Sequence, residues 1–301
     1  ALEFENAVVV RTFSKAFGLA GLRVGYAIAS PRIVAWLRSV GSPFTCGTWS
    51  RAAAVHRLAT GHADVEAYVR AVAAEREQLA TVLVAAGLEP LPSAGNFVFV
   101  RGGDPLWLRD ALSGLGIAVR AFASGVRITV PGDAAVSERL TAAVTAASRP
   151  TALLLDLDGV LADIDGRTAL ASVAELQALA AMLPIGVVTS CPQRLAESVL
   201  ARHGFAPHVR VLVTAEDGPG KPDPAPVRTS LQRLGQQSAW MLGDNPGDVL
   251  AARGAGVVPL AIEPRGIGAE SHAERLRECG AARLVAGLPG VLQLLTALPK
   301  R

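Results

Sequence analysis

Short apolar runs alternate with amphipathic helical stretches through the second half of the chain. The runs cover residues 153–155, 185–188, 211–213, 240–242 and 257–260. Helical patterns separate them, around residues 169–182, 192–203, 224–234 and 247–254. Regular alternation of strand and helix is typical of a parallel sheet with helices on both faces. We therefore predict a doubly wound, Rossmann-like α/β domain in this half.

The first half of the chain carries a less regular pattern. Residues 8–10 and 26–29 form short apolar runs that predict strands, and residues 50–85 have the period of one or two long helices. Residues 96–100 and 127–130 predict two further strands. This half is therefore expected to be a mixed α+β unit.

The clearest boundary between the two patterns falls at residues 147–150. An alanine-rich helical stretch at 134–147 precedes it, and Pro150 cannot continue a helix. A chain of 301 residues has the length of two domains. We place the first domain at residues 1–148 and the second at 151–301.

Composition excludes several classes of protein. Half of the residues are hydrophobic, so the chain can bury cores and is not disordered. The net charge is +3, but the basic residues are scattered singly, and we expect no nucleic-acid partner. No apolar run reaches the roughly 18 residues that a membrane span needs, so we expect no membrane partner. Cys46, Cys191 and Cys279 lie far apart and are odd in number, which favours a reducing, cytoplasmic location.

Lysine is scarce in this chain. Of the 29 basic residues, only Lys15, Lys221 and Lys300 are lysines. A lysine amine can lose its proton and attack a carbonyl, whereas a guanidinium effectively cannot. The lysines are therefore the first positions at which to look for chemistry.

Polar side chains follow four of the strands predicted in the second half. They are Asp156, Asp158, Thr189, Lys221, Asp244 and Asp248. Ligands bind at the carboxyl ends of strands in open α/β sheets. Carboxylates suit Mg²⁺ and can form an aspartyl-phosphate, while an amine and a hydroxyl can hold phosphate oxygens. A single Asp after a strand is often only a loop or helix-cap residue, but the ordered set favours phosphoryl transfer.

The strings DLDGV, VVTS, GKP and GDNPGD carry these residues within 151–264. They resemble the haloacid dehalogenase superfamily of phosphohydrolases, whose signature is DxDG(V), then Ser or Thr after a strand, then Lys, then GDxxxD. The resemblance implies that Asp156 is the nucleophile and Asp158 the general acid and base. It implies that Thr189 holds the phosphoryl group, with the neighbouring Ser190 as the weaker candidate.

The same resemblance implies a Mg²⁺ site. Asp156, the backbone carbonyl of Asp158 and Asp244 would hold the ion, with help from Asp248. Lys221 would neutralise the phosphate and orient Asp156. We therefore predict a Mg²⁺-dependent phosphomonoester hydrolase that acts on a small phosphorylated metabolite through an aspartyl-phosphate.

Members of this superfamily that act on small metabolites usually insert a cap domain between the first and second motifs, or between the second and third. Here about 30 residues separate Asp158 from Thr189, and about 30 separate Thr189 from Lys221, enough for one helix each time. We predict a domain with no sizeable cap and an open site. Specificity then has to come from loops, from the first segment or from a partner subunit.

A second candidate site surrounds Lys15, in the string RTFSKAFGLAGLRVGY. Its amine can form a Schiff base with an aldehyde, while Thr12, Ser14 and Arg23 can bind a phosphate. The alternative is that this lysine is only an exposed residue at a helix start.

The string resembles the lysine region of fold-type I pyridoxal-phosphate aminotransferases, in particular the histidinol-phosphate aminotransferase family. SAGNFVFVR and GVRITVPG resemble two later segments of that family. The resemblance implies that Lys15 is the catalytic lysine that joins pyridoxal 5′-phosphate, and that the three phosphate-binding side chains serve this cofactor. Arg127 would bind the substrate carboxylate, and Arg120 would reach a substrate phosphate.

This resemblance covers residues 1–148 and only the C-terminal part of the family fold. In the family, the groups that complete the cofactor site lie upstream of the lysine, and the chain begins 14 residues before Lys15. The first residues read as the middle of a domain and not as a signal peptide. We expect pyridoxal phosphate to bind only if the missing N-terminal half is supplied.

Our leading hypothesis is a fusion of a truncated aminotransferase module with a capless phosphohydrolase. An aminotransferase that makes an amino-alcohol phosphate, followed by a phosphatase, would perform consecutive steps of histidine biosynthesis. One alternative is that the first module is a structural remnant, kept for packing or for homodimer formation, and that only the phosphatase acts. The other is a non-catalytic regulatory protein.

Overall fold

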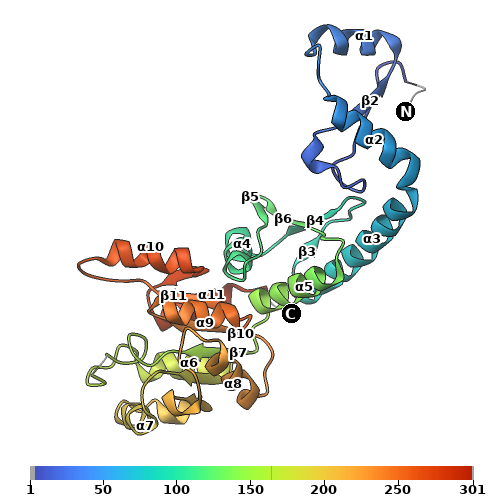
Figure 1. Ribbon diagram of the computed structural model, residues 1–301. Helices are drawn as coiled ribbons and strands as arrows, with labels where there is room; N and C mark the ends of the chain where they lie inside the picture. Colours follow the sequence, from blue (N-terminus) through green and yellow to red (C-terminus); the bar gives the residue numbers. More distant parts are fainter. Residues whose placement is uncertain (1–3, 164, 300–301) are drawn as a thin grey trace. The chain divides into compact units, whose positions relative to one another are not determined.

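The computed structural model describes residues 4–163 and 165–299 (Figure 1). Lys300 therefore lies outside the described residues. The chain divides into two compact units, residues 1–74 and 75–301. Each unit is described by itself. Within the described residues, no helix is both long enough and apolar enough to cross a membrane.

The first unit holds a two-stranded antiparallel sheet and helices. Its elements are β1 Val8–Thr12, the 3₁₀ turn Ala20–Leu22, β2 Gly25–Ala29, α1 Pro31–Val40, α2 Thr48–Thr60 and the beginning of α3 His62–Ala85. The core of this unit is small, with Phe13, Val24 and Ala54 buried. The predicted strands and the two long helices are thus present.

The second unit begins with a four-stranded antiparallel sheet in the order β3-β4-β6-β5. Its elements are β3 Glu89–Pro90, β4 Phe97–Arg101, α4 Pro105–Gly114, β5 Arg120–Phe122, β6 Gly125–Thr129 and α5 Ala134–Ser148. Asp104 and Asp133 begin the two helices, since each carboxylate accepts a hydrogen bond from a backbone N–H of the first turn. The mixed α+β character predicted for this half is confirmed.

The rest of the second unit is built on a six-stranded parallel sheet in the order β12-β11-β10-β7-β8-β9. The strands are β7 Ala152–Leu155, β8 Ile185–Val188, β9 Val211–Val213, β10 Ala239–Gly243, β11 Val258–Ile262 and β12 Arg283–Val285. The first five match the predicted apolar runs, and all residues of β7, β8 and β10 are buried. Such continuous apolar runs are typical of strands covered on both faces.

Helices connect these strands, and one more helix follows the last strand. They are α6 Val173–Met182, α7 Gln193–Arg202, α8 Ala225–Leu234, α9 Pro246–Gly254, α10 Ala269–Cys279 and α11 Leu288–Ala297, with short 3₁₀ turns at Ala206–His208 and Ala215–Asp217. In the described part of the chain, the connection from β7 to β8 holds a loop and α6, and no inserted domain. The prediction of a doubly wound domain without a sizeable cap is confirmed.

Asp163 and Asp165 lie in the loop between the first motif and α6, where acidic residues can also start a helix. Helix α6 begins at Val173, where Ser172 and Glu175 form a capping box. The Asp163 carboxylate instead accepts hydrogen bonds from the backbone N–H groups of Arg167 and Thr168. A short polar side chain stabilises a loop in the same way as it starts a helix, so the sequence alone did not separate the two.

The strand order places a topological switch between β7 and β10. From β7 the chain adds β8 and β9 on one side, and it then returns to add β10, β11 and β12 on the other. The loops that follow β7 and β10 therefore diverge and leave a crevice at the carboxyl end of the sheet. This is where open α/β sheets bind ligands.

Helices of the antiparallel part cover one face of the parallel sheet. Helix α4 contacts β11 and β12, and α5 contacts β10. The Trp107 and Trp240 rings lie 4.6 Å apart between centroids. Their indole N–H groups donate to the backbone carbonyls of Ala147 and Ala146, at 3.1 and 2.8 Å. The two parts of the second unit therefore share a core.

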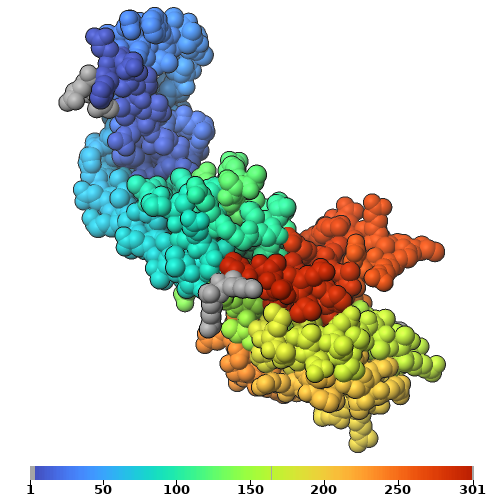
Figure 2. Space-filling model, turned by 180° about the vertical axis from the view of Figure 1, so that it is seen from behind, coloured from blue at the N-terminus to red at the C-terminus, as the bar shows by residue number. Residues whose placement is uncertain are grey.

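Two further contacts hold this junction. The Arg283 guanidinium lies 3.2 Å from the carboxylate of Asp104, which caps α4, and 3.2 Å from the carboxylate of Asp110, which belongs to α4. At Gly114, a Cβ atom would lie 2.9 Å from the carbonyl oxygen of Gly280, so only glycine allows α4 to approach this closely. In Figure 2 the red segment that ends at residue 299 lies against the blue-green part of the same unit. The predicted domain boundary at 148–151 therefore falls inside one compact unit, and as a domain division it stays a prediction.

We expect Trp107→Ala to lower the free energy of unfolding of the second unit by about 3–5 kcal/mol, because it removes a buried aromatic ring from the shared core. Urea denaturation followed by circular dichroism would measure the change. Trp49→Ala is the matched control, since this indole is 87% exposed. Equal effects of the two substitutions would contradict the shared core.

Candidate active site

Lys221 lies at the centre of the candidate site, where it contacts two carboxylates and a backbone carbonyl. Its ammonium lies 2.8 Å from Oδ1 of Asp156 and 2.6 Å from Oδ1 of Asp248. It also donates to the carbonyl of Val188 at 3.0 Å. All three side chains are almost fully buried, with exposed fractions of 5% or less. One buried cation, the Lys221 ammonium, therefore contacts the ends of β7 and β8 and the first turn of α9.

Asp248 also holds the turn between β10 and α9. Its Oδ2 accepts hydrogen bonds from the backbone N–H groups of Asp244 and Asn245, at 3.2 and 3.1 Å. Asn245 caps α9 by accepting from the N–H groups of Gly247 and Asp248. This reciprocal capping box keeps Asp244 at the edge of the crevice.

Asp156, Asp244 and Asp248 form the one group of potential metal ligands found among the described residues, with ligand atoms within 4.8 Å of one another. Burial and repulsion from Asp248 raise the pKa of Asp156 to about 8, against the attraction of Lys221. Burial and Asp248 also raise the pKa of Asp244. Burial alone would lower the pKa of Lys221, but Asp156 and Asp248 raise it. Three carboxylates around one ammonium leave an excess of negative charge, and this oxygen-rich set fits a divalent cation.

Gly159 brings the loop after β7 against Asp244. Its φ of +71° lies in the left-handed region, as expected for the glycine that turns the chain after the first motif. A Cβ atom at this position would clash with the Asp244 carboxylate. The glycine is therefore required both by the turn and by the close approach.

Cys191 is a contact of Asp158 that sequence reasoning missed. Its thiol donates to Oδ2 of Asp158 at 3.0 Å. Burial and this hydrogen bond raise the pKa of the Cys191 thiol, so it remains a donor at neutral pH. The only signal in the sequence was its place two residues after Thr189.

Thr189 lies at the end of β8 and is buried, with 4% of its surface exposed. Its hydroxyl oxygen accepts from the backbone N–H of Cys191 at 3.1 Å. The hydroxyl proton is therefore available to a ligand. Ser190 beside it is exposed.

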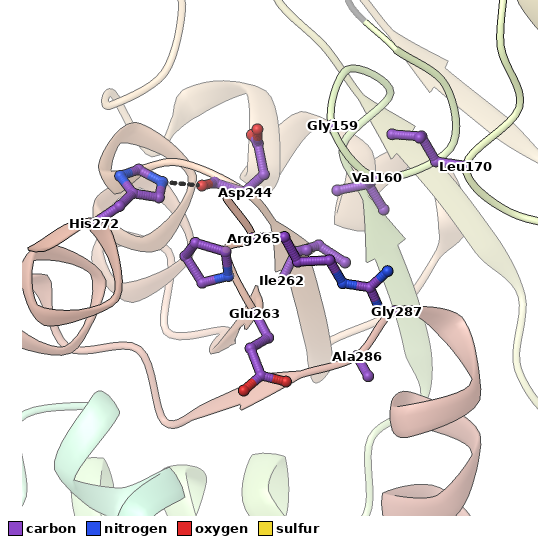
Figure 3. Close-up of a pocket in the computed structure, with 11 residues that line it drawn as sticks. Gly159, Val160, Leu170, Asp244, Ile262, Glu263, Arg265, His272, Ala286 and Gly287 are labelled. Atoms are coloured by element: carbon purple, nitrogen blue, oxygen red, sulfur yellow. Dashed lines mark hydrogen bonds between the residues drawn. The ribbon is translucent and has the colours of Figure 1, made fainter. Parts of the chain in front are cut away.

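A cavity of about 360 Å³ opens next to Asp244 (Figure 3). It is lined by Gly159 and Val160 from the loop after β7, by Glu263 and Arg265 after β11, and by residues of neighbouring elements: Leu170, Asp244, Ile262, Pro264, His272, Ala286 and Gly287. His272 belongs to none of the sequence motifs and lacks the spacing of a metal ligand. Its Nε2 donates to the backbone carbonyl of Asp244 at 2.8 Å. This hydrogen bond stabilises the turn between β10 and α9, in addition to the contacts of Asp248.

The residues predicted to bind the pyridoxal phosphate lie in the first unit. Thr12, Ser14 and Arg23 line an open hollow of about 400 Å³. Arg23 has a φ of +51°, an uncommon conformation for a residue other than glycine. Lys15 is exposed and is not among the residues that line the hollow.

The two arginines predicted to bind a substrate lie in the second unit, and the structure makes them cross-strand neighbours. Arg120 on β5 pairs with Arg127 on β6. The Arg127 guanidinium lies 4.7 Å from the centre of the Phe97 ring. Like charges directly opposite each other are unfavourable, and an anion placed between them would relieve the repulsion.

Comparison with known families supports both resemblances. Residues 3–144 match the family described as aminotransferase class I and II. Residues 169–262 match the family described as haloacid dehalogenase-like hydrolase. The second match contains Thr189, Lys221 and Asp244 and begins after the first motif.

Similar curated proteins match the first segment. An aromatic amino acid aminotransferase of Nocardia farcinica is 44% identical over 130 residues, which are 42% of this chain and 36% of the relative. A histidinol-phosphate aminotransferase of Gloeobacter violaceus is 43% identical over 152 residues, 49% of this chain and 42% of the relative. The chain thus spans well under half the length of these relatives.

Similar solved structures match each segment in turn. A histidinol-phosphate aminotransferase from Sinorhizobium meliloti, in complex with pyridoxal-5′-phosphate, is 30% identical with a TM-score of 0.42, and the match covers 49% of this chain and 42% of that chain. A haloacid dehalogenase-superfamily hydrolase from Geobacter sulfurreducens is 19% identical with a TM-score of 0.38, covering 48% of this chain and all of that chain. By the family matches, an aminotransferase class I and II-like segment is followed in this chain by a haloacid dehalogenase-like hydrolase segment.

Proposed function

We propose that the second segment is a Mg²⁺-dependent phosphomonoester hydrolase that acts through an aspartyl-phosphate. The observation that carries this proposal is the cluster of buried Asp156, Lys221 and Asp248 with half-buried Asp244 at the topological switch point. A strand-end carboxylate held by a lysine beside a cation-binding set is suited to nucleophilic phosphoryl transfer.

The contacts of Asp156 select its attacking atom. Oδ1 accepts from the backbone N–H of Leu157 at 2.8 Å and also contacts Lys221. Oδ2 is therefore the oxygen left for the attack on phosphorus. The Oδ2–P bond forms as the ester P–O bond breaks, and the leaving alcohol takes a proton.

Asp158 supplies that proton and later recovers one. Its side chain is half-buried and is oriented by the Cys191 thiol. Once the alcohol has left, Asp158 removes a proton from water as the water attacks phosphorus. The P–Oδ2 bond then breaks, which restores the Asp156 carboxylate and releases inorganic phosphate.

The remaining residues hold the phosphoryl group. The Thr189 hydroxyl donates to a phosphate oxygen, and the Lys221 ammonium offsets its charge. Asp156, Asp244, Asp248 and the carbonyl of Asp158 would hold Mg²⁺, which when bound neutralises charge that develops on the phosphoryl oxygens.

We propose that the first segment forms part of a pyridoxal-phosphate site. This site is complete only when the rest of the aminotransferase fold is supplied. Thr12, Ser14 and Arg23 around one hollow support the binding of the cofactor phosphate. The relatives of this segment are named both for aromatic amino acids and for histidinol phosphate, so histidine biosynthesis is one of two assignments in keeping with the similarity. The exposure of Lys15 favours the second candidate, a segment that serves only for packing or for homodimer formation.

Asp156→Asn is expected to reduce Mg²⁺-dependent release of phosphate from 4-nitrophenyl phosphate by about a thousandfold or more, because an amide is a far weaker nucleophile than a carboxylate. Initial rates would be measured at saturating Mg²⁺. Asp165→Asn, an exposed residue of the loop after β7, is the matched control and should keep the wild-type rate. A wild-type protein without activity would refute the proposed hydrolase.

Mg²⁺ is expected to raise the melting temperature of the wild-type protein by about 5 °C at a hundredfold excess over its dissociation constant, since it binds the folded state and relieves repulsion among the three carboxylates. Differential scanning fluorimetry would measure the shift. Asp244→Asn should remove most of it, whereas Asp165→Asn should not. An equal shift in both variants would place the ion elsewhere.

Incubation with pyridoxal 5′-phosphate tests the first segment. A Schiff-base absorbance band is expected when the N-terminal part of the aminotransferase fold is supplied together with this chain. The band should be lost in Lys15→Ala, while Lys300→Ala should keep it. Borohydride reduction and peptide mapping would locate the modified lysine. Modification spread equally over several amines would favour the structural role instead.

A further inference from the structure

The cavity beside Asp244 is placed to receive the alcohol part of the substrate, an inference that rests on the proposed hydrolase. Asp244 belongs to the carboxylate cluster and also lines the cavity, as does Gly159 of the loop that carries Asp158. A phosphoryl group bound between Asp156 and Thr189 therefore has this cavity as its neighbour. Its volume of about 360 Å³ suits a small molecule.

Two opposite charges line this cavity without pairing. Glu263 and Arg265 follow β11, on either side of Pro264. Within residues 4–163 and 165–299, neither side chain forms an ion pair or a side-chain hydrogen bond. In Figure 3 the Glu263 carboxylate and the Arg265 guanidinium point to different sides of the cavity, the latter toward Gly287. Each charge is free to meet a ligand group of opposite sign.

The rest of the lining is mostly apolar. Val160, Leu170 and Ile262 contribute aliphatic side chains, and Ala286 adds a methyl group. Such a wall accepts a short carbon chain. Of the two other polar side chains in the lining, Asp244 belongs to the carboxylate cluster, and both ring nitrogens of His272 already contact protein groups. The chemistry of recognition therefore depends on the two charged side chains.

We propose that this cavity selects phosphomonoesters whose alcohol part is a small zwitterion, an amino acid phosphorylated on its hydroxyl group. Arg265 binds the carboxylate in a charge-assisted, bidentate contact, and Glu263 binds the ammonium group. An anionic alcohol part without the amine meets repulsion from Glu263, and a cationic one without the carboxylate meets repulsion from Arg265. The pair thus both attracts the zwitterion and disfavours its competitors.

Four probes of different charge test the assignment: O-phosphoserine, phosphoethanolamine, phosphoglycolate and 4-nitrophenyl phosphate. For the wild-type protein, we expect kcat/KM to be highest with O-phosphoserine. Glu263→Gln should lower kcat/KM about tenfold for the two amine probes, and Arg265→Gln about tenfold for the two carboxylate probes, through KM. Both variants should hydrolyse 4-nitrophenyl phosphate at the wild-type rate.

Glu278→Gln and Arg277→Gln are matched controls on α10, because both residues are exposed and lie outside the cavity lining. They should leave all four kcat/KM values unchanged. A wild-type preference for any other probe, or variants that affect all four probes alike, would overturn the assignment of the cavity. Failure of the wild-type protein to hydrolyse 4-nitrophenyl phosphate would instead overturn the proposed hydrolase, so the two failures are distinguishable.

Discussion

The buried ammonium of Lys221 is the interaction on which the candidate site depends. It joins Asp156 after β7, the carbonyl of Val188 on β8 and Asp248 on α9. Without it, two buried carboxylates would face each other with no cation between them, and an uncompensated buried charge is strongly unfavourable. The same contacts determine where Oδ2 of Asp156 and the turn at Asp244 lie. Local folding and the proposed catalysis therefore rely on one cation, at a position where a chain that otherwise mostly uses arginine has a lysine.

The junction between the two family segments shows how a fused module can become part of a neighbouring fold. Helices α4 and α5 come from the aminotransferase-like segment, yet they cover the β10–β12 side of the parallel sheet. Trp107 and Trp240 interdigitate there, and Gly114 permits the close approach. Part of the first segment thus has a structural role in the hydrolase-like domain, whether or not Lys15 binds a cofactor. A structural role and a catalytic one are compatible, because they involve different residues.

The absence of an inserted domain from the described connection between β7 and β8 changes how such a site gains selectivity. A cap would close over the substrate and exclude water. Here the loop after β11 and the start of α10 border the cleft instead, and they bring Glu263, Arg265 and His272 beside Asp244. In the proposed hydrolase, recognition is then supplied by charged side chains at the edge of the sheet. Discrimination by charge does not require enclosure, since a misplaced charge is unfavourable even in a partly open cavity.

The sequence by itself determined the strands of the parallel sheet and the polar residues at their ends. Buried parallel strands need uninterrupted apolar runs, and their carboxyl ends share one edge, so Asp156, Thr189 and Asp244 were predictable neighbours. Other contacts join residues that lie far apart in the chain, and no local sequence pattern predicts them. Only the tertiary structure decided these contacts. These are the thiol of Cys191 on Asp158, the imidazole of His272 on the Asp244 carbonyl, and α4 against the sheet. Periodicity reports which face of an element is buried, but what covers that face depends on how the whole chain packs.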